Sequence, residues 1–301
     1  MLNNMKICFV YSNRSELSLL LPFIQFFKKK SKVKILDLSK KIKSLENDSN
    51  LSKVYVYCYK NFKINNYDFI CVLGDRRELP FVSLAALFLE QKLVHLGAGE
   101  YVDGMPTYDQ QIRPSISFFS NIQITFSKQA TQNVKKLFSS TKFLKINVFS
   151  TGNPSFKNIE ITKLSRPYKE KYDLVLLHPQ SLSKTNTIKD IQIIKTKLKN
   201  KKTIFIHGNS DKHYDLIEKF YDELKLQKRD YDFIKSTNKK KYFSLIKFCD
   251  KFYTNTSGIS EINKINPNCH VNIGKRNKNR SLMDFNDDAP ELLYKFLKKQ
   301  K

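Results

Sequence analysis

Short apolar runs alternate along this chain with longer segments in which apolar residues recur at helical spacing. The runs are typical of buried strands and the longer segments of amphipathic helices, so their alternation predicts parallel sheets covered by helices on both faces. The clearest helical segments are residues 16–29, 80–91 and 288–299. The predicted strands are residues 6–11, 33–36, 54–57, 69–73, 93–96, 122–126, 146–149, 174–177, 203–207, 233–235, 251–254 and 270–273.

The pattern of strands and helices is interrupted once. Residues 155–171 are polar, contain Pro167 and show no sustained periodicity, which is typical of a linker. The pattern then starts again, so we predict two domains, at residues 1–160 and 161–301. The helix at the end of the chain is expected in the second domain, with Pro290 accommodated in its first turn.

Composition narrows the class of protein. A formal net charge of +26 attracts anions, but the lysines form short scattered clusters without an aromatic platform, which favours a solvated surface. Among anions, the pattern favours a phosphate-bearing small substrate over nucleic acid. Five cysteines without C-x-x-C spacing predict buried, reduced thiols and no metal site. No apolar run approaches the ~20 residues of a bilayer span, and the N-terminal run is too short for a signal-peptide core. We expect a soluble cytoplasmic enzyme.

Charged residues follow the predicted strands of the first domain. Asp75 and Arg76 come directly after the strand at residues 69–73, and Glu100 follows the strand that contains His95. The carboxyl ends of parallel strands meet at one edge of a sheet, where ligands bind in open α/β folds. The alternative for His95 is a core histidine whose ring nitrogens are satisfied.

Two further candidates in this domain lie on predicted helices. Asp109 and Arg113 are four residues apart, so they share one face of a helix that begins near Tyr108; the alternative is a surface salt bridge. Arg14 follows capping residues after the first strand and marks a candidate anion site, unless it points into solvent from an ordinary capped turn.

The second domain has the same kind of strand ends. His178 ends one strand and is a candidate acid or base, and Asn209 follows the next. Hydroxyls and a glycine at a helix start predict a phosphate cradle, and an acid just inside that helix can bind a ribose diol. The residues of this turn are Thr256, Ser257, Gly258 and Glu261, with Gly274 and Arg276 nearby in the sequence. The alternative is an ordinary capped helix.

The motifs, taken in order, resemble the UDP-N-acetylglucosamine 2-epimerase family, most closely its hydrolysing members of the sialic-acid type, which serve surface-sugar and nonulosonic-acid biosynthesis. They are Asn13-Arg14-x-Glu16, Gly74-Asp75-Arg76, His95 with Gly99-Glu100, Asp109-x-x-x-Arg113, Gly152-Asn-Pro154, His178-Pro179, Asn209-x-Asp211, Ser257-Gly258 with Glu261, and Asn272-x-Gly274-x-Arg276. The resemblance covers nearly the whole chain. It implies an α/β GT-B architecture: two Rossmann-like parallel-sheet domains facing a central cleft that holds the nucleotide sugar.

The resemblance also implies a reaction and roles for residues. UDP leaves C1 as the C2 proton is lost, and water then adds to the unsaturated sugar; non-hydrolysing members add UDP back. Asp75 and Asp109 would be the acid–base carboxylates, Glu100 an alternative base, and His178 a group acting at the sugar. The implied substrate-binding residues are Arg14, Arg76, His95, Arg113, Asn209, Thr256, Ser257, Gly258, Glu261 and Arg276. No metal or redox cofactor is implied, and a homo-oligomer is compatible with the family.

The sequence departs from the family pattern mainly on the sugar-facing side. Gly97 stands where relatives have an ionisable residue, and further departures are Gln110, Phe118, Asn121 and Gln123. These departures leave open a variant sugar, a different base, or loss of catalysis. The alternatives to an epimerase are therefore a glycosyltransferase of the same architecture, a nucleotide-sugar binder without turnover, and a nucleic-acid binder that rests on charge alone.

Overall fold

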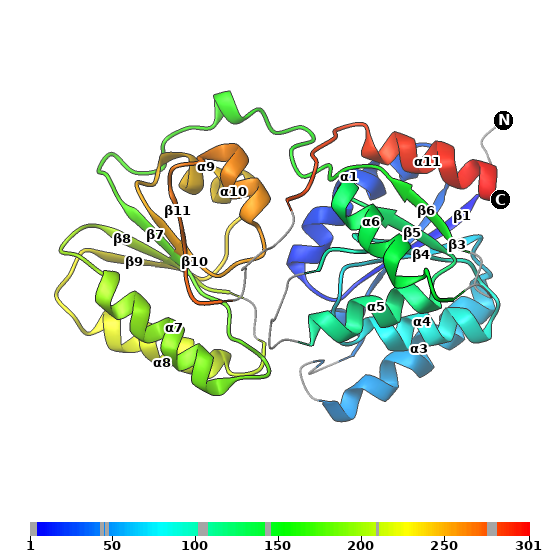
Figure 1. Cartoon of the computed structure of the whole chain (residues 1–301), viewed down its shortest axis with the longest axis horizontal. Coiled ribbons are helices and arrows are strands. Elements are labelled where there is room, and N and C mark those ends of the chain that lie inside the picture. The colour runs from blue at the N-terminus through cyan, green and yellow to red at the C-terminus, as the bar shows by residue number, and fades with distance from the viewer. Residues whose placement is uncertain are drawn as a thin grey trace. The chain divides into compact units, whose positions relative to one another are not determined.

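The computed structural model describes residues 5–42, 45, 48–101, 108–141, 146–208, 211–275 and 282–301 (Figure 1). The chain forms two compact units. The first contains residues up to 101, residues 108–157 and residues 283–301, and the second contains residues 158–282.

The first unit is built on a six-stranded sheet in the order β2-β1-β3-β4-β5-β6, with every neighbouring pair parallel. Every residue of β3 and β4 is buried, as expected for central strands covered on both faces. The strands are β1 (Lys6–Tyr11), β2 (Lys32–Asp37), β3 (Phe69–Leu73), β4 (Leu93–Leu96), β5 (Ile122–Thr125) and β6 (Asn147–Ser150).

Helices cover both faces of this sheet (Figure 1). One apolar cluster joins the sheet to α1 and α11, and a second joins it to α2, α3 and α4. The helices are α1 (Arg14–Lys28), α2 (Leu38–Lys41), α3 (Leu51–Asn65), α4 (Leu79–Phe88), α5 (Asp109–Phe119), α6 (Lys128–Leu137) and α11 (Ala289–Gln300), with a 3-10 turn η1 (Asp48–Asn50).

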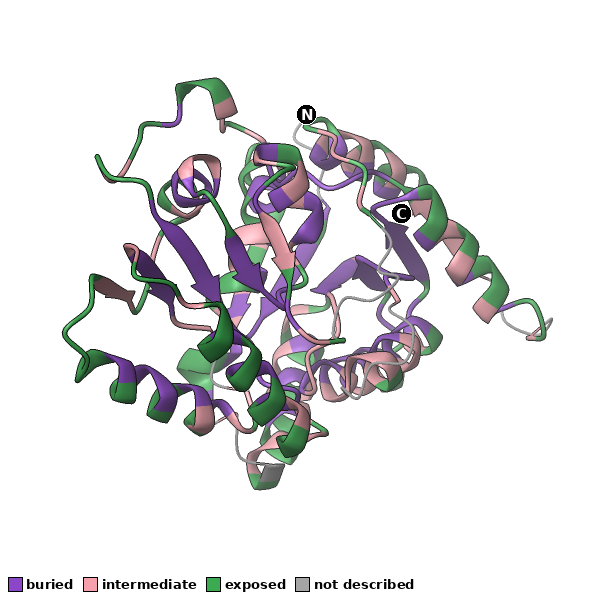
Figure 2. Cartoon of the chain, turned by 60° about the vertical axis from the view of Figure 1, so that its left-hand side comes forward, coloured by how far each residue is buried: buried purple, intermediate pink, exposed green. Residues whose placement is uncertain are grey.

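The second unit repeats the design with a five-stranded parallel sheet in the order β11-β10-β7-β8-β9. Its three central strands are buried and its two edge strands are mostly half-buried, while Figure 2 shows helices with buried stripes on one side and exposed residues on the other. The strands are β7 (Asp173–Leu176), β8 (Thr203–Ile206), β9 (Tyr231–Ile234), β10 (Phe252–Thr254) and β11 (His270–Asn272). The helices are α7 (Lys184–Lys197), α8 (Tyr214–Lys225), α9 (Lys239–Phe248) and α10 (Ile259–Ile265), after a 3-10 turn η2 (Ile161–Lys163).

One predicted strand is wrong. Residues 54–57 lie inside α3. Their alternating valines and tyrosines suit a strand, but Val54, Cys58 and Phe62 are all buried, and their spacing of four places them on one helical face against the sheet. Packing of that face decides the conformation over the local β preference.

The C-terminal helix belongs to the first unit, which corrects its expected place in the second domain. Leu293 and Leu297 of α11 are fully buried in the cluster that contains Phe23 and Phe27 of α1. The ring of Tyr294 meets that of Phe27 edge to face, with 5.5 Å between centroids. The last residues therefore return to complete the core of the N-terminal sheet.

Leu293→Ala is expected to lower the free energy of unfolding by about 2–5 kcal/mol, because it opens a cavity in this core. Denaturant titration measures the change. Leu226→Ala is the matched control: its side chain is 88% exposed, so the same truncation is expected to change stability by no more than about 0.5 kcal/mol. Equal effects for the two variants would contradict the placement of α11 in the core.

Two predictions from composition can be checked within the described chain. All five cysteines are buried, as predicted, and none of them forms a disulfide in the structure. Among the described helices, none combines the length and the apolar character that crossing a bilayer demands.

Candidate functional site

Asp75 and Arg113 form a partly buried ion pair at the carboxyl edge of the first sheet. Asp75 follows β3 through Gly74, and Arg113 reaches it from the first half of α5. Nη2 of Arg113 donates to Oδ2 of Asp75, and Nη1 donates to the carbonyl oxygen of Gly97. The arginine side chain is only 8% exposed, so one cation is held in the interior where β3 and β4 end.

Two more carboxylates lie near this arginine. Burial by itself would lower the pKa of Arg113, but the charges of Asp75, Glu100 and Asp109 raise it above its usual value. Glu100 is itself buried. The structure thus gathers the three predicted carboxylates of the first domain around one guanidinium, a concentration of negative charge that suits proton transfer.

His95 is held in the interior of the first unit by both ring nitrogens. It is fully buried, its Nε2 lies 2.8 Å from the Gly74 carbonyl oxygen, and its Nδ1 lies 2.9 Å from Oγ of Ser117. Burial and the charge of Arg113 lower its pKa to about 3, so the ring is neutral. A neutral ring donates from Nε2 to the carbonyl and accepts the Ser117 hydroxyl at Nδ1. This geometry favours the alternative of a core histidine that fixes the turn carrying Asp75, and a contact of His95 with substrate stays a prediction.

The residues that depart from the family pattern mostly support the backbone. Gly97 has a φ of +71°, a left-handed conformation that favours glycine, and it supplies its carbonyl oxygen to Arg113. Oδ1 of Asn121 accepts a hydrogen bond from the Leu93 amide, and Nε2 of Gln123 donates to the Ser117 carbonyl. Phe118 packs on the ring of Phe138 with 4.9 Å between centroids. Gln110 is half-buried on α5.

The turn after β1 carries a buried carboxylate that the sequence reading treated only as part of a motif. Oε2 of Glu16 accepts hydrogen bonds from the Ser12 amide (2.7 Å), the Ser12 hydroxyl (2.8 Å) and the Asn13 amide (3.2 Å), while Asn13 caps α1 in return. Burial and the neighbouring Glu78 raise the pKa of Glu16 to about 7. Arg14, the predicted anion-binding residue, is exposed at the first position of α1. Nε of Arg76 lies 3.5 Å from Oε1 of Glu78, and the charge of Arg76 acts against the rise in the pKa of Glu16.

The free energy of unfolding of Glu16→Gln, taken relative to that of wild type at the same pH, is expected to increase as the pH rises from 5 to 8. The folded pKa of about 7 lies above the ordinary 4.5, so above pH 4.5 the unfolded chain releases this proton first and the folded state loses stability. The loss reaches at most about 3 kcal/mol by pH 8. Glutamine keeps an oxygen for the cap but does not ionise.

Denaturant titrations of both proteins at pH 5 and pH 8 measure this effect. Glu291→Gln is the control, because Glu291 is an exposed glutamate in the first turn of α11 whose pKa is lowered by its bond to Lys295. It is expected to show no gain at high pH. Parallel stability curves for wild type and Glu16→Gln would contradict the prediction.

In the second unit, His178 lies directly beyond β7 and is held by Asn255. Oδ1 of Asn255 accepts the His178 amide at 2.7 Å, and Nδ2 donates to the His178 carbonyl at 2.8 Å. Nδ2 also donates to Asp190 on α7 at 3.1 Å. The ring lies close to Gly208, where an added Cβ would come within 3.1 Å of Nδ1. His178 itself is partly exposed, so its ring can meet a ligand.

The residues predicted to cradle a phosphate lie close together in this unit. An ideal Cβ on Gly258 would lie 3.8 Å from Oε2 of Glu261 and 3.9 Å from Oγ1 of Thr256, so these three residues lie together. Ser257 between them is exposed. Burial lowers the pKa of Lys239 on α9, and the charge of Glu261 acts in the opposite direction. Asn209 and Arg276 lie outside the described residues.

Sequence reasoning missed three buried polar residues of these edges: Glu16, Asn255 and Asp190. Asn255 could have been found from its place directly after a strand, between two threonines. Asp190 had a weaker signal, an acid at helical spacing from Thr187 and Ile194 on the buried face of α7. Within the described part of the chain, no group of three or more His, Cys, Asp or Glu side chains is placed to hold a metal ion.

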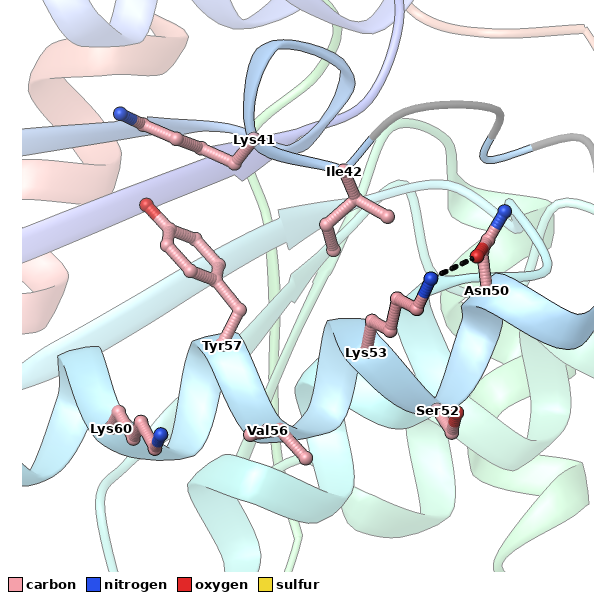
Figure 3. Close-up of a pocket in the computed structure, with 8 residues that line it drawn as sticks. All are labelled: Lys41, Ile42, Asn50, Ser52, Lys53, Val56, Tyr57 and Lys60. Carbon is pink, nitrogen blue, oxygen red and sulfur yellow. Dashed lines mark hydrogen bonds between the residues drawn. The ribbon is translucent and has the colours of Figure 1, made fainter.

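A cavity of about 650 Å³ lies elsewhere on the first unit, between α2 and α3 (Figure 3). Its lining is basic and partly apolar: Lys41, Ile42, Asn50, Ser52, Lys53, Val56, Tyr57 and Lys60. None of the predicted site residues lines it. We therefore place the candidate site at the strand ends and not in this cavity.

This chain is similar to known proteins over most of its length. The model of the family described as UDP-N-acetylglucosamine 2-epimerase matches residues 23–283. The chain is 28% identical over 233 residues to polysialic acid biosynthesis protein P7 of Escherichia coli. It is 30% identical over 226 residues to GDP/UDP-N,N'-diacetylbacillosamine 2-epimerase (hydrolyzing) of Campylobacter jejuni. These alignments cover 73% and 71% of this chain but 58% of each relative, less than two thirds of their length.

Solved structures agree on the fold. UDP-GlcNAc 2-epimerase of Methanocaldococcus jannaschii, in complex with UDP-GlcNAc and UDP, matches 98% of this chain and 100% of its own with a TM-score of 0.73 at 16% identity. The enzyme of Neisseria meningitidis bound to UDP-GlcNAc has the same coverage and TM-score at 14% identity. The prediction of two Rossmann-like parallel-sheet domains of the GT-B type is confirmed. Because the family model spans most of its residues, the chain belongs to the UDP-N-acetylglucosamine 2-epimerase family.

Proposed function

We propose that this protein is a hydrolysing 2-epimerase that converts a UDP-2-acetamido sugar into UDP and the free 2-epimeric sugar. The observation that carries the proposal is the cluster of Asp75, Glu100 and Asp109 around the buried Arg113. Family membership and the hydrolysing relative from Campylobacter jejuni support the same reaction.

The chemistry needs a base near C2 of the sugar. A carboxylate of the first unit takes the C2 proton, the C2–H electrons form a C1–C2 double bond, and UDP leaves with the C1–O electron pair. Water then adds across the double bond, and C2 receives a proton on the opposite face. Asp75 and Asp109 are the proposed acid–base pair. Both lie near Arg113 together with Glu100, so a proton can pass between neighbouring carboxylates within the site.

The second unit supplies the proposed site for uridine diphosphate. Thr256 and Ser257 offer hydroxyls to the phosphates, and Ser257 adds its backbone amide, since the amides of Thr256 and Gly258 already donate within the turn. Glu261 accepts hydrogen bonds from the ribose diol, and His178 acts at the sugar. Arg14, Arg76, Asn209 and Arg276 are proposed substrate contacts by resemblance.

Incubation with UDP-N-acetylglucosamine in deuterated water tests the reaction, with mass spectrometry of the products. Free UDP together with a 2-epimeric sugar carrying deuterium at C2 is the expected result. A panel of UDP- and GDP-activated 2-acetamido sugars, including the diacetylbacillosamine nucleotides named for the Campylobacter jejuni relative, identifies the sugar. Neither UDP release nor C2 exchange with any of them would refute the proposal, and transfer to an acceptor without exchange would indicate a glycosyltransferase.

A further inference from the structure

One buried carboxylate of the second unit has no part in the reaction proposed above. Asp190 is 3% exposed on α7, on the face that also buries Thr187, Ile191 and Ile194. A buried charge is costly unless hydrogen bonds compensate it. The groups around Asp190 therefore show what this position does.

Oδ2 of Asp190 joins the loops that follow two strands. It accepts a hydrogen bond from Nε2 of Gln180 at 2.8 Å and another from Nδ2 of Asn255 at 3.1 Å. Gln180 lies in the loop after β7, two residues beyond His178, and Asn255 directly follows β10. The side chain of Asn255 also forms hydrogen bonds with the amide and the carbonyl oxygen of His178. The position of His178 is thus set through a side chain that Asp190 holds.

Oδ1 of Asp190 faces a third loop. Gly274 follows β11 with a φ of +67°, and an ideal Cβ on it would lie 2.1 Å from this oxygen. The backbone at Gly274 therefore packs directly on the carboxylate, which is why no larger residue fits. The Ile273 amide, just before it, donates to the Thr254 carbonyl at 2.9 Å and ties this loop to the end of β10.

The three loops come from neighbouring strands, because the sheet order runs β11-β10-β7 (Figure 1). We propose that Asp190 is a positioning residue of the nucleotide-binding edge: its carboxylate fixes the loops after β7, β10 and β11 in one arrangement, so that His178 and the turn from Thr256 to Gly258 present a preformed site for a nucleoside diphosphate. This inference rests on the proposed function, since that function assigns these residues to the ligand.

Asp190→Asn keeps the shape of the side chain and tests its hydrogen bonding. In wild type, Oδ2 of Asp190 accepts from the side-chain amides of Gln180 and Asn255, and Oδ1 faces Gly274. The side chain of the variant replaces one of these oxygens with an NH₂ group, which cannot accept a hydrogen bond. Loss of an acceptor in a buried site is expected to weaken UDP binding roughly tenfold. Negative charge near a diphosphate acts in the opposite direction, so tighter UDP binding by the variant would overturn the proposal.

Hydrogen exchange of the full chain gives a readout that needs no ligand. In Asp190→Asn we expect faster exchange in all three loops together, reported by the amides of His178, Thr256 and Ile273, which donate to partners in this network. The loops after β8 and β9 are expected to keep their protection. Asp222→Asn is the control: it removes the same charge from an exposed aspartate of α8 paired with Lys225 and is expected to change neither exchange nor UDP affinity.

A double-mutant cycle tests the contact with Gly274. Gly274→Ala is expected to weaken UDP binding strongly, because its Cβ collides with the carboxylate of Asp190. In an Asp190→Ala background the collision is absent, so the same glycine substitution is expected to weaken binding several-fold less. Equal losses in both backgrounds would show that Asp190 and Gly274 act independently.

The outcomes separate this inference from the proposed reaction. A wild-type chain that binds UDP without C2 exchange, and loses that binding in Asp190→Asn, contradicts the reaction and supports the positioning role. An active wild type whose Asp190→Asn variant keeps its UDP affinity and its loop protection contradicts the positioning role alone. Exchange that accelerates uniformly over the second unit would also overturn it, because that result indicates general loss of stability.

Discussion

Asparagine in place of Asp75 is expected to slow deuterium incorporation at C2 by about 10³-fold while leaving UDP affinity nearly unchanged, in the middle of the range of roughly 10²–10⁴ for a residue that transfers a proton. Asparagine keeps the size of the side chain but cannot take up the proton. The cradle proposed for UDP lies in the second unit, on residues that Asp75 does not support. Arg113 keeps its bond to the Gly97 carbonyl and the nearby charges of Glu100 and Asp109.

The measurement is the exchange assay in deuterated water, with UDP affinity determined by calorimetry on the same preparation. Asp287→Asn is the matched control, since Asp287 is an exposed aspartate of the first unit and is expected to leave both quantities unchanged. Exchange within tenfold of wild type in Asp75→Asn would remove Asp75 from the proton transfer. The acid–base role would then fall to Asp109 or Glu100, and the corresponding amide variants would distinguish them.

Much of the carboxyl edge of the first sheet could be predicted, because the end of a strand can be recognised from the sequence alone. An apolar run followed by Gly74 and Asp75 places the acid at the carboxyl edge of a parallel sheet, and the spacing of Asp109 and Arg113 places both on one helical face. The sequence did not predict the ion pair between Arg113 and Asp75, which joins residues 38 positions apart. That pairing depends on how α5 lies over the sheet, which residue spacing does not determine.

Other features escaped the sequence reading because packing decided them. The strand expected at residues 54–57 is part of α3, since a strand that buried Val54, Cys58 and Phe62 would also bury Val56 and Lys60, which are exposed. The last helix joins the first unit through contacts with a helix more than 200 residues earlier in the chain. Asp190 reaches Asn255 across 65 positions, so no local motif identifies the contact. Composition and periodicity describe segments, and these features are pairings between segments.

Methionine in place of Arg113 is expected to lower the free energy of unfolding by about 3 kcal/mol, the lower end for a buried ion pair, because the arginine is buried while Asp75 is partly exposed. Asp75 and Glu100 would then lie close together without their shared cation. The proposed epimerase activity is expected to fall with Asp75 released from its hydrogen bond. Arg113→Lys is expected to recover only part of both losses, since an ammonium lacks the forked donors that reach Asp75 and the Gly97 carbonyl together.

Denaturant titration at pH 7 and at pH 4.5 separates lost packing from unpaired charge. The destabilisation by Arg113→Met is expected to shrink at the lower pH, where protonation removes the like charges that the arginine no longer balances. Arg229→Met, at an exposed arginine bonded to the Tyr231 hydroxyl, controls for the substitution itself and is expected to be near neutral at both pH values. A loss in Arg113→Met that is the same at both pH values would show that Arg113 stabilises the fold by packing, and the three acids would then need another explanation for their shared location.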